Sequence, residues 1–245
     1  MKFFVTIFFL IFNSAYTQTS GKVTYKFSAP LILEGVPSED SKKLISNIVD
    51  YANKQQFELI FNGSSSKFIY IETLNFDSEF DRKINNIART AFTSVDSYTD
   101  LNQKKQFTVM NDGTLVENSI GTVKWEITTE TKKIGEYLTY KAILRIPFTS
   151  RNGESKERLV ISWFAPSIPY SFGPKNFSGL PGLILELNED QKTFIASKIE
   201  LFENETKVEF PRGKAISKEE YNRRLESSMG GFIISKRREE AKEKN

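Results

Sequence analysis

The 245-residue sequence contains no cysteine and no histidine. The first absence excludes disulfide bonds and thiol nucleophiles, and the second excludes imidazole bases and Ser-His-Asp triads. Together they exclude every zinc site built on His or Cys. Catalysis would therefore rest on carboxylates, Lys, Tyr or Arg, or on a hard metal ion bound by oxygen ligands. No motif indicates such a site, and we predict no metal, no cofactor and no catalytic residue.

The chain also lacks a strong charge imbalance and, beyond its N-terminus, any long apolar run. Its 34 Lys and Arg residues face 31 Asp and Glu residues, which gives a net charge of +3. Basic and acidic side chains are interleaved, as in Lys236–Lys244, unlike the clustered basic residues of nucleic-acid-binding proteins. No later segment approaches the roughly 20 apolar residues that a membrane-spanning helix needs. We expect no nucleic-acid partner and no transmembrane helix in the mature chain.

The N-terminus has the pattern of an export signal. Lys2 supplies a positive charge, and Phe3–Phe12 is an apolar run of about ten residues, which is too short to span a bilayer. Ala15 and Thr17 are small residues placed for a cleavage that would leave Gln18 as the new N-terminus. The run shows no period-2 alternation, which disfavours a buried strand. We therefore predict that residues 1–17 are a signal peptide and that the protein is secreted or periplasmic.

Short alternating strands dominate the rest of the sequence. In Lys22–Phe27 the apolar side chains of Val23, Tyr25 and Phe27 share one face, as in a half-buried strand. Comparable runs predict strands at Gln56–Asn62, Lys67–Thr73, Gln106–Met110, Thr122–Thr128, Tyr137–Ile146, Glu157–Phe164, Leu183–Leu187, Lys192–Phe202 and Lys207–Phe210. Turn dipeptides between strands are Asn62-Gly63, Asp112-Gly113 and Asn152-Gly153. The fold class predicted is mainly β: a single antiparallel, strongly curved sheet or half-barrel.

Two helices are expected beside this sheet. The segment 38–54 begins at Ser38 and carries an apolar stripe, so we expect it to pack on the sheet. A short C-terminal helix begins at Ser217, because Ser217 and Glu220 form a capping box. The sequence after Ile234 is nearly all charged. We predict one β-rich domain over 18–234 and a charged tail over 235–245.

The most distinctive segment lies between Ser162 and Leu187. Proline and glycine make its part from Pro166 to Gly182 a long, stiff connection that also carries aromatic side chains. The sequence Leu180-Pro181-Gly182-Leu183 fits a type II turn, in which the glycine takes a φ of about +80°. We expect a strand to leave this turn directly at Leu183.

This segment resembles the GLPGLI family of secreted bacterial proteins, named after the string that stands here as Gly179-Leu180-Pro181-Gly182-Leu183-Ile184. The family's upstream features stand here as Trp163, Ile168-Pro169 and Gly173-Pro174. Its earlier features stand as Trp125, Lys132-Lys133-Ile134-Gly135 and Lys141-Ala142. Many members carry a cysteine near the Lys-Ala strand, where this chain has Leu138-Thr139. The resemblance implies a secreted or periplasmic protein of Gram-negative bacteria, and it implies no established activity.

The signature segment admits a structural and a binding interpretation. Under the structural one, Gly179 and Gly182 permit a tight corner while Leu180, Leu183 and Leu185 pack inside. The full structural signature is Gly173, Pro174, Gly179, Leu180, Pro181, Gly182, Leu183 and Ile184. A phosphate-binding loop is disfavoured, because a strand rather than a helix follows it.

Under the binding interpretation, aromatic side chains around the connection anchor a ligand or a partner. The candidate binding residues are Trp163, Tyr170, Phe172 and Phe177. Filling the core is the alternative role for the same side chains, and it is the one the sequence favours.

Two classes of function remain open. The favoured class is a non-catalytic envelope protein that binds an apolar ligand, a lipid or an outer-membrane protein partner. The alternative is an envelope hydrolase that uses two facing carboxylates as acid and base. The carboxylates that could contribute are Glu126, Glu157, Glu186, Glu189 and Asp190. Nothing in the sequence pairs them, and isolated acidic residues on such strands usually form the solvated face. A deep apolar groove would support binding, whereas two carboxylates about 5–10 Å apart in a polar cleft would support hydrolysis.

Overall fold

The computed structural model describes residues 20–72, 78–92, 95–121, 123–150 and 153–228. The predicted signal peptide, its cleavage site between Thr17 and Gln18, and the charged tail 235–245 lie outside the described residues.

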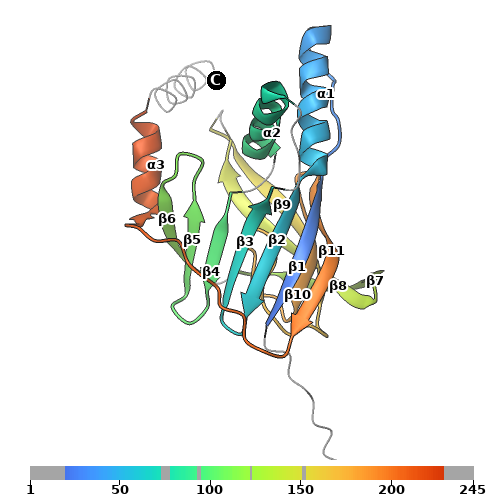
Figure 1. The fold of residues 1–245 in the computed structure, drawn as a ribbon, viewed down its shortest axis with the longest axis vertical. Coiled ribbons are helices and arrows are strands. Elements are labelled where there is room, and N and C mark those ends of the chain that lie inside the picture. The colour runs from blue at the N-terminus through green and yellow to red at the C-terminus, as the bar shows by residue number, and fades with distance from the viewer. Residues whose placement is uncertain (1–19, 73–77, 93–94, 122, 151–152, 229–245) are drawn as a thin grey trace, which may run out of the picture.

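One open sheet of twelve strands forms the body of the protein (Figure 1). The strands are β1 Ser20–Ser28, β2 Gln56–Asn62, β3 Ser65–Ile71, β4 Ser97–Asp100, β5 Lys105–Val109, β6 Leu115–Ser119, β7 Glu126–Ile134, β8 Tyr137–Thr149, β9 Ser155–Ala165, β10 Leu183–Glu189, β11 Lys192–Phe202 and β12 Ile216–Ser217. Their order across the sheet is β12-β6-β5-β4-β3-β2-β1-β11-β10-β9-β8-β7. Neighbours are antiparallel except β12 and β6. The predicted mainly β fold with a curved antiparallel sheet is confirmed, and the sheet is not closed.

The core lies on the inner face of the curve, where alternate residues of facing strands meet. On β1 the inward residues Val23, Tyr25 and Phe27 are buried, as the alternation predicts. The ring of Phe57 on β2 stacks on Phe68 of β3 and meets Phe194 of β11 edge to face at a centroid distance of 5.2 Å. These aromatic side chains come from strands on both sides of β1, so their packing favours the curvature of the sheet.

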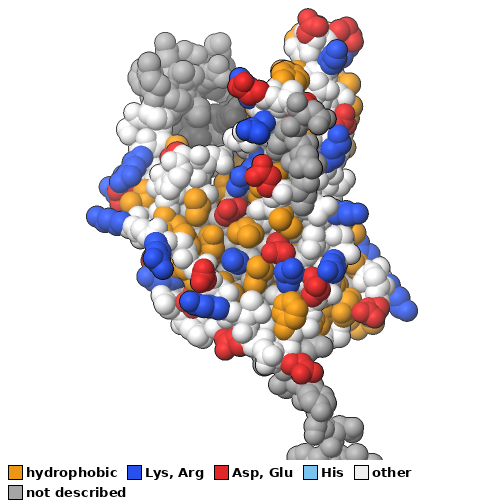
Figure 2. Space-filling view, in the orientation of Figure 1, with side chains coloured by type: hydrophobic (Ala, Val, Ile, Leu, Met, Phe, Trp, Pro, Cys, Tyr) orange, Lys and Arg blue, Asp and Glu red, His pale blue; other side chains and the backbone are white. Residues whose placement is uncertain are grey.

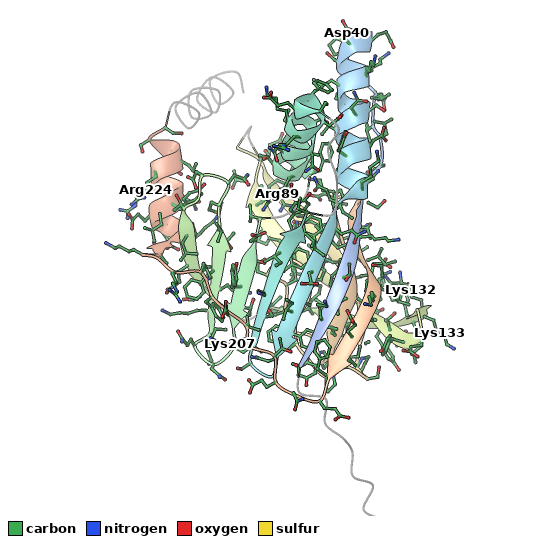
Figure 3. The ribbon with its side chains drawn as sticks, viewed as in Figure 1. Asp40, Arg89, Lys132, Lys133, Lys207 and Arg224 are labelled. Carbon is green, nitrogen blue, oxygen red and sulfur yellow. The ribbon has the colours of Figure 1, made fainter. Side chains whose placement is uncertain are left out.

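Among the described residues, three helices accompany the sheet: α1 Glu39–Lys54, α2 Glu79–Phe92 and α3 Lys218–Glu226. The backbone N–H of Ser41 donates to Ser38 Oγ at 3.2 Å, and that of Glu220 donates to Ser217 Oγ at 3.1 Å, so both predicted helix starts are confirmed. Helix α1 packs against α2, and both project past the ends of the strands (Figure 1). In Figure 3, Asp40 marks the far tip of α1. The first helix therefore meets the sheet only at its C-terminal end, near β1.

Helix α2 was not predicted, although it carries a start signal. Ser78 Oγ accepts from the N–H of Asp81 at 3.1 Å, which caps the helix N-terminus, and it donates to the Asp81 carboxylate at 2.7 Å. The inward side of the helix is mixed, because the buried Asn85 accepts a 2.8 Å hydrogen bond from Gln55. The polar side chain of this asparagine lies between Ile84 and Ala88 on the inward side. It interrupts the apolar stripe by which an amphipathic helix is recognised in a sequence.

Three short strands, β4, β6 and β12, were also missed, and one predicted strand is wrong. Strand β4 places Ser97 and Thr99 on its inner side, so its pattern is polar where a core strand would be apolar. Lys207–Phe210 forms no strand. It belongs to the connection that crosses the outer face of the sheet (Figure 1), where the Phe210 ring packs on Tyr98 and Phe107 at 5.9 Å. The alternation of polar and apolar residues in Lys207–Phe210 therefore reflects packing of this segment against the sheet, not pairing as a strand within the sheet.

The outer face carries charged side chains among scattered apolar ones (Figure 2). Lys132 and Lys133 on β7 and Arg224 on α3 lie on opposite sides of the molecule (Figure 3). Within the described residues, no helix combines the length and the apolar character needed to cross a bilayer.

Candidate functional site

The connection between β9 and β10, residues 166–182, runs along the inner side of the curved sheet. Side chains from three strands or strand ends donate hydrogen bonds to its backbone carbonyls. Ser97 Oγ bonds Lys175 at 2.6 Å, Gln106 Nε2 bonds Asn176 at 2.7 Å, and Trp125 Nε1 bonds Ser178 at 2.9 Å. The first two donors come from the neighbouring strands β4 and β5, and the third comes from the approach to β7, which is the last strand at the other end of the sheet order. The connection therefore links the two halves of the sheet.

The signature corner that ends this connection is buried. The amide of Leu183 donates to Ile168 and that of Ile184 donates to Phe172, each at 2.9 Å. The hydroxyl of Tyr25 on β1 donates to the carbonyl of Ile184 at 2.5 Å. Complete burial raises the pKa of Tyr25, so this phenol stays protonated as a donor. The structural role predicted for the signature fits this packing.

The predicted type II turn at Gly182 is wrong in its detail. Its φ is +158°, far from the value of about +80° that such a turn requires. Glycine is needed for a different reason: a Cβ at this position would lie 2.4 Å from the carbonyl oxygen of Ala165. Gly173 is also tightly enclosed, because a Cβ there would lie 2.6 Å from Cβ of Ile184. Close approach of two chain segments, rather than turn chemistry, requires these glycines.

A partly buried ion cluster holds the middle of the connection. Glu189 on β10 accepts hydrogen bonds from Lys175 Nζ and, at 2.9 Å, from Arg158 Nη1 on β9. Burial by itself raises the pKa of Glu189, but the attraction of Lys175 and Arg158 outweighs it and lowers the pKa below its usual value. Lys175 has a φ of +59°, which non-glycine residues seldom adopt. The ion pair and the bond from Ser97 offset that strain.

The structure separates the four aromatic residues predicted to bind. Phe172 is 1% exposed and lies in the core, where no ligand reaches it. Trp163 lies on the opposite face of β9 from the buried Phe164 and is covered by the amine of Lys132, 4.3 Å from its ring. Tyr170 packs on Phe61 at 4.8 Å. Phe177 lines one of the two cavities described next.

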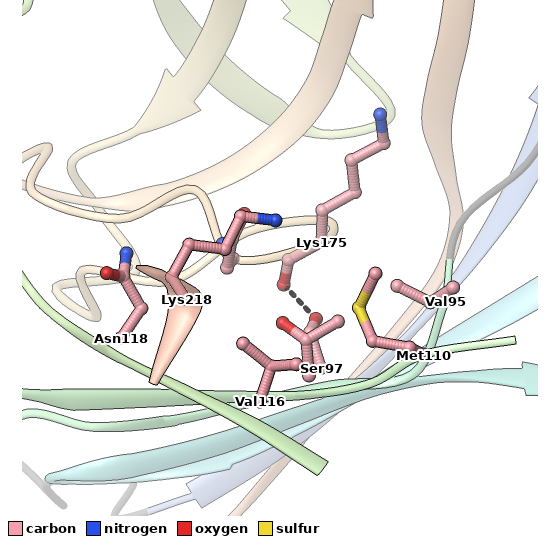
Figure 4. Close-up of a pocket in the computed structure, with 9 residues that line it drawn as sticks. Val95, Ser97, Met110, Val116, Asn118, Lys175 and Lys218 are labelled. Carbon is pink, nitrogen blue, oxygen red and sulfur yellow. Dashed lines mark hydrogen bonds between the residues drawn. The ribbon is translucent and has the colours of Figure 1, made fainter. Parts of the chain in front are cut away.

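Two adjacent cavities lie between the connection and the open side of the sheet. The first, of about 330 Å³, is lined by Ser97, Val116 and Lys218 among others (Figure 4). The second, of about 440 Å³, lies between the end of β6, the residues after it, and β8. Both linings include Asn118 and Asn176, so we describe the two cavities together as the trough. The apolar side chains that line the trough are Val95, Met110, Val116, Ile120, Val123, Leu144, Ile146, Pro147 and Phe177.

Every charged residue in the lining of the trough is basic. These residues are Lys124, Arg145, Lys175 and Lys218. Lys175 is engaged by Glu189, whereas Lys124 and Lys218 form no ion pair with any of the described residues. Figure 4 shows Lys218 reaching over the first cavity and the amine of Lys175 pointing away from it. The trough therefore combines an apolar surface with uncompensated positive charge.

The carboxylates considered for hydrolysis lie elsewhere. Glu186 pairs with Lys132 at 2.7 Å, and Asp190 pairs with Arg158 at 3.0 Å. Glu157 is exposed and lies 4.0 Å from Arg145. Among the described residues no cluster of acidic side chains is placed to hold a metal ion. A general acid needs a raised pKa, and the pKa of Glu189 is lowered, so its environment opposes that role.

Comparison with known proteins supports the fold and leaves the activity open. Residues 149–186 match the family model described as "Protein of unknown function (Porph_ging)". The match covers β9, the connection and the first half of β10, and it is compatible with the resemblance to the GLPGLI family, whose name it does not confirm. No curated protein matches the sequence.

Two solved structures share the fold. Both are structures of PNGF-II, in the P21 and C2 space groups. The first has a TM-score of 0.52 at 14% identity over 85% of this chain, and the second has a TM-score of 0.50 at 15% identity over 90%. This chain spans only 33% of the length of each of those chains. At such identity the likeness concerns the fold alone.

Sequence reasoning missed most of the trough. Lys218 is far from Asn118 and Val123 in the sequence, and no motif brings the three together. The one sequence signal near Asn118 is the turn dipeptide Asp112-Gly113, which indicates that a strand follows it. In the structure this turn returns the chain along β6, and Gly113 has a φ of +80°.

Proposed function

We propose that the protein is a non-catalytic binding protein of the cell envelope and that the trough is its binding site. The observation that carries the proposal is the composition of the trough: nine apolar side chains, several amide and hydroxyl groups, and charged side chains that are all basic. Such a lining suits a ligand or a partner segment with apolar groups and negative charge. The export pattern at residues 1–17 supports action outside the cytoplasm.

The alternative, a carboxylate-dependent hydrolase, receives less support. A glycosidase-type mechanism needs two carboxyl groups flanking the reacting bond, one of them protonated. The trough is lined by no Asp or Glu, and Glu189 is held ionised by two cations. An apolar groove without a facing acidic pair is the arrangement expected of a binding protein.

An anionic apolar dye tests the trough as a binding site. We expect anilinonaphthalene sulfonate to bind the purified protein saturably, and Val123→Glu to weaken its binding about tenfold, because a carboxylate would repel the sulfonate. Ile127→Glu is the matched control, since Ile127 is an exposed residue of β7 outside the trough lining. Equal effects of the two substitutions in a fluorescence titration would contradict the proposal.

Export is tested by the mature N-terminus. We expect mass spectrometry of the protein recovered from the envelope of an expressing Gram-negative cell to show a chain that starts close to Gln18. The physical reason is that signal peptidase cleaves after small residues such as Thr17. An envelope protein that still carried Met1 would overturn the prediction.

A further inference from the structure

Two free strand edges face each other across the larger cavity of the trough. Its lining includes Asn118 and Ser119 from β6 and Leu144–Pro147 from β8. We name these two stretches, with the cavity between them, the seam. The sheet order ends with β12-β6 on one side and β8-β7 on the other, so the seam is the place where the curved sheet fails to close.

The edge of β6 is open beyond a short contact with β12. The amide of Ile120 donates to Lys104, and the amide of Met110 donates to Thr114. By the alternation of an antiparallel ladder, even-numbered residues of β6 bond β5 and odd-numbered ones face outward. Strand β12 pairs only with Val116 and Glu117. The outward backbone groups of Ser119 therefore lie past the end of β12 and face the seam.

The edge of β8 is open in the same way. The amide of Ser150 donates to Glu154, so even-numbered residues of β8 bond β9, and odd-numbered ones face the other side. Strand β7 begins at Glu126, opposite Ile143, and among the described residues no strand pairs with β8 beyond that point on this side. The backbone groups of Arg145 consequently face the seam.

The position of Pro147 agrees with this assignment. Proline has no N–H, and inside a sheet it is confined to edges where its nitrogen needs no partner. Pro147 lies within the 13-residue strand β8 at an odd-numbered position, so its nitrogen faces the seam rather than β9. The strand keeps its pairing with β9 intact.

We propose that the seam binds an extended peptide segment of a partner protein, which adds as a strand beside β6 or β8 and inserts alternate apolar side chains into the trough. This inference rests on the proposed binding function and specifies its ligand. Exposed backbone donors and acceptors along an edge are matched by another extended backbone, whereas an aliphatic chain leaves them unpaired. The basic residues Lys124 and Arg145 at the seam select acidic side chains on the segment.

A labelled heptapeptide of alternating Glu and Val provides the test, with fluorescence polarisation as the measurement. We expect it to bind the full mature chain, and we expect the same peptide with every backbone amide N-methylated to bind about tenfold more weakly, because it lacks backbone donors. A version with Lys in place of Glu is expected to bind more weakly for electrostatic reasons. Oleate is the lipid competitor, and we expect it to displace the peptide poorly.

The protein side of the test uses a matched pair of substitutions. Ser119→Pro removes one edge N–H without touching the pairing of β6 with β5, and we expect it to weaken peptide binding about tenfold. Ser119→Ala keeps the N–H and should bind as the parent does. Should Ser119→Pro fail to fold, the N-methylated peptide tests the same backbone pairing on the parent protein through the donors of the peptide.

The results distinguish two claims: strand addition at the seam, and the binding function of the trough. Equal affinity for the normal and N-methylated peptides, or tight oleate binding without peptide binding, would overturn strand addition. Dye binding that responds to Val123→Glu would in either case leave the proposed binding function standing. If Val123→Glu did not weaken dye binding, the proposed binding function would itself be contradicted.

Discussion

Gly182→Val is expected to destabilise the protein by about 3–5 kcal/mol, at the upper end of single-substitution effects. The physical cause is the backbone of the neighbouring segment. A Cβ at position 182 would lie 2.4 Å from the carbonyl oxygen and 2.7 Å from the carbonyl carbon of Ala165, and 2.9 Å from Cα of Pro166. Backbone atoms cannot rotate away as a side chain can, so β9 and β10 would have to separate. Chemical denaturation followed by circular dichroism measures the change.

Two neighbouring substitutions serve as controls for this result. Gly179→Ala meets no atom closer than 3.8 Å, so it should cost only the strain of its φ of +94°, about 1–2 kcal/mol. Pro181→Ala, at an exposed position, should cost less than about 1 kcal/mol, because it mainly frees the unfolded chain. A Gly182→Val protein as stable as the Gly179→Ala protein would refute the close approach as the reason for this glycine.

Glu189→Gln is expected to lower the free energy of unfolding by about 2–4 kcal/mol at neutral pH. The substitution removes the negative charge that Lys175 and Arg158 share at a partly buried site, and it leaves Arg158 with Asp190 as its ion-pair partner while Lys175 loses the ion pair with Glu189. It also releases the connection, because Lys175 belongs to it. Glu157→Gln is the control: Glu157 is exposed, contacts Arg145 at 4.0 Å only, and should show no measurable change.

The effect of Glu189→Gln should depend on pH in a defined direction. The folded protein lowers the pKa of Glu189, so the carboxylate contributes its stability above the unfolded value, which is about 4.3. That contribution is lost as the pH falls through the lower, folded pKa. The difference between parent and Glu189→Gln should therefore be full at neutral pH and shrink below about pH 4. A difference that stayed constant down to pH 3 would show that lost packing, not charge, causes it.

Local chemistry made some of the fold predictable. The start of α1 at Ser38 and of α3 at Ser217 follow from side-chain capping, which involves residues three apart. Strand β2, Gln56–Asn62, and strand β11, Lys192–Phe202, follow from alternation along one run, and both were predicted with their exact bounds. These signals depend on a few neighbouring residues and need no knowledge of the rest of the chain.

The inner surface was less predictable because it depends on contacts between distant segments. Phe172 and Phe177 lie five positions apart in one connection, yet the first is in the core and the second lines the trough. Ser97 looks like a surface residue in the sequence, but it is buried because its hydroxyl bonds the carbonyl of Lys175. Curvature of the sheet decides which of these side chains meets solvent, and no local pattern encodes it.

The most direct test of the trough as a binding site uses the absence of cysteine. In the Asn118→Cys variant the new thiol is the only one in the protein, and it lies in a residue that lines both cavities. We predict that saturating anilinonaphthalene sulfonate slows maleimide modification of this thiol. The same dye should leave the rate unchanged in Asn102→Cys, whose residue is exposed in the β4–β5 turn outside the trough lining. Equal rates with and without dye in the Asn118→Cys protein, measured where the dye is shown to be bound, would contradict the assignment.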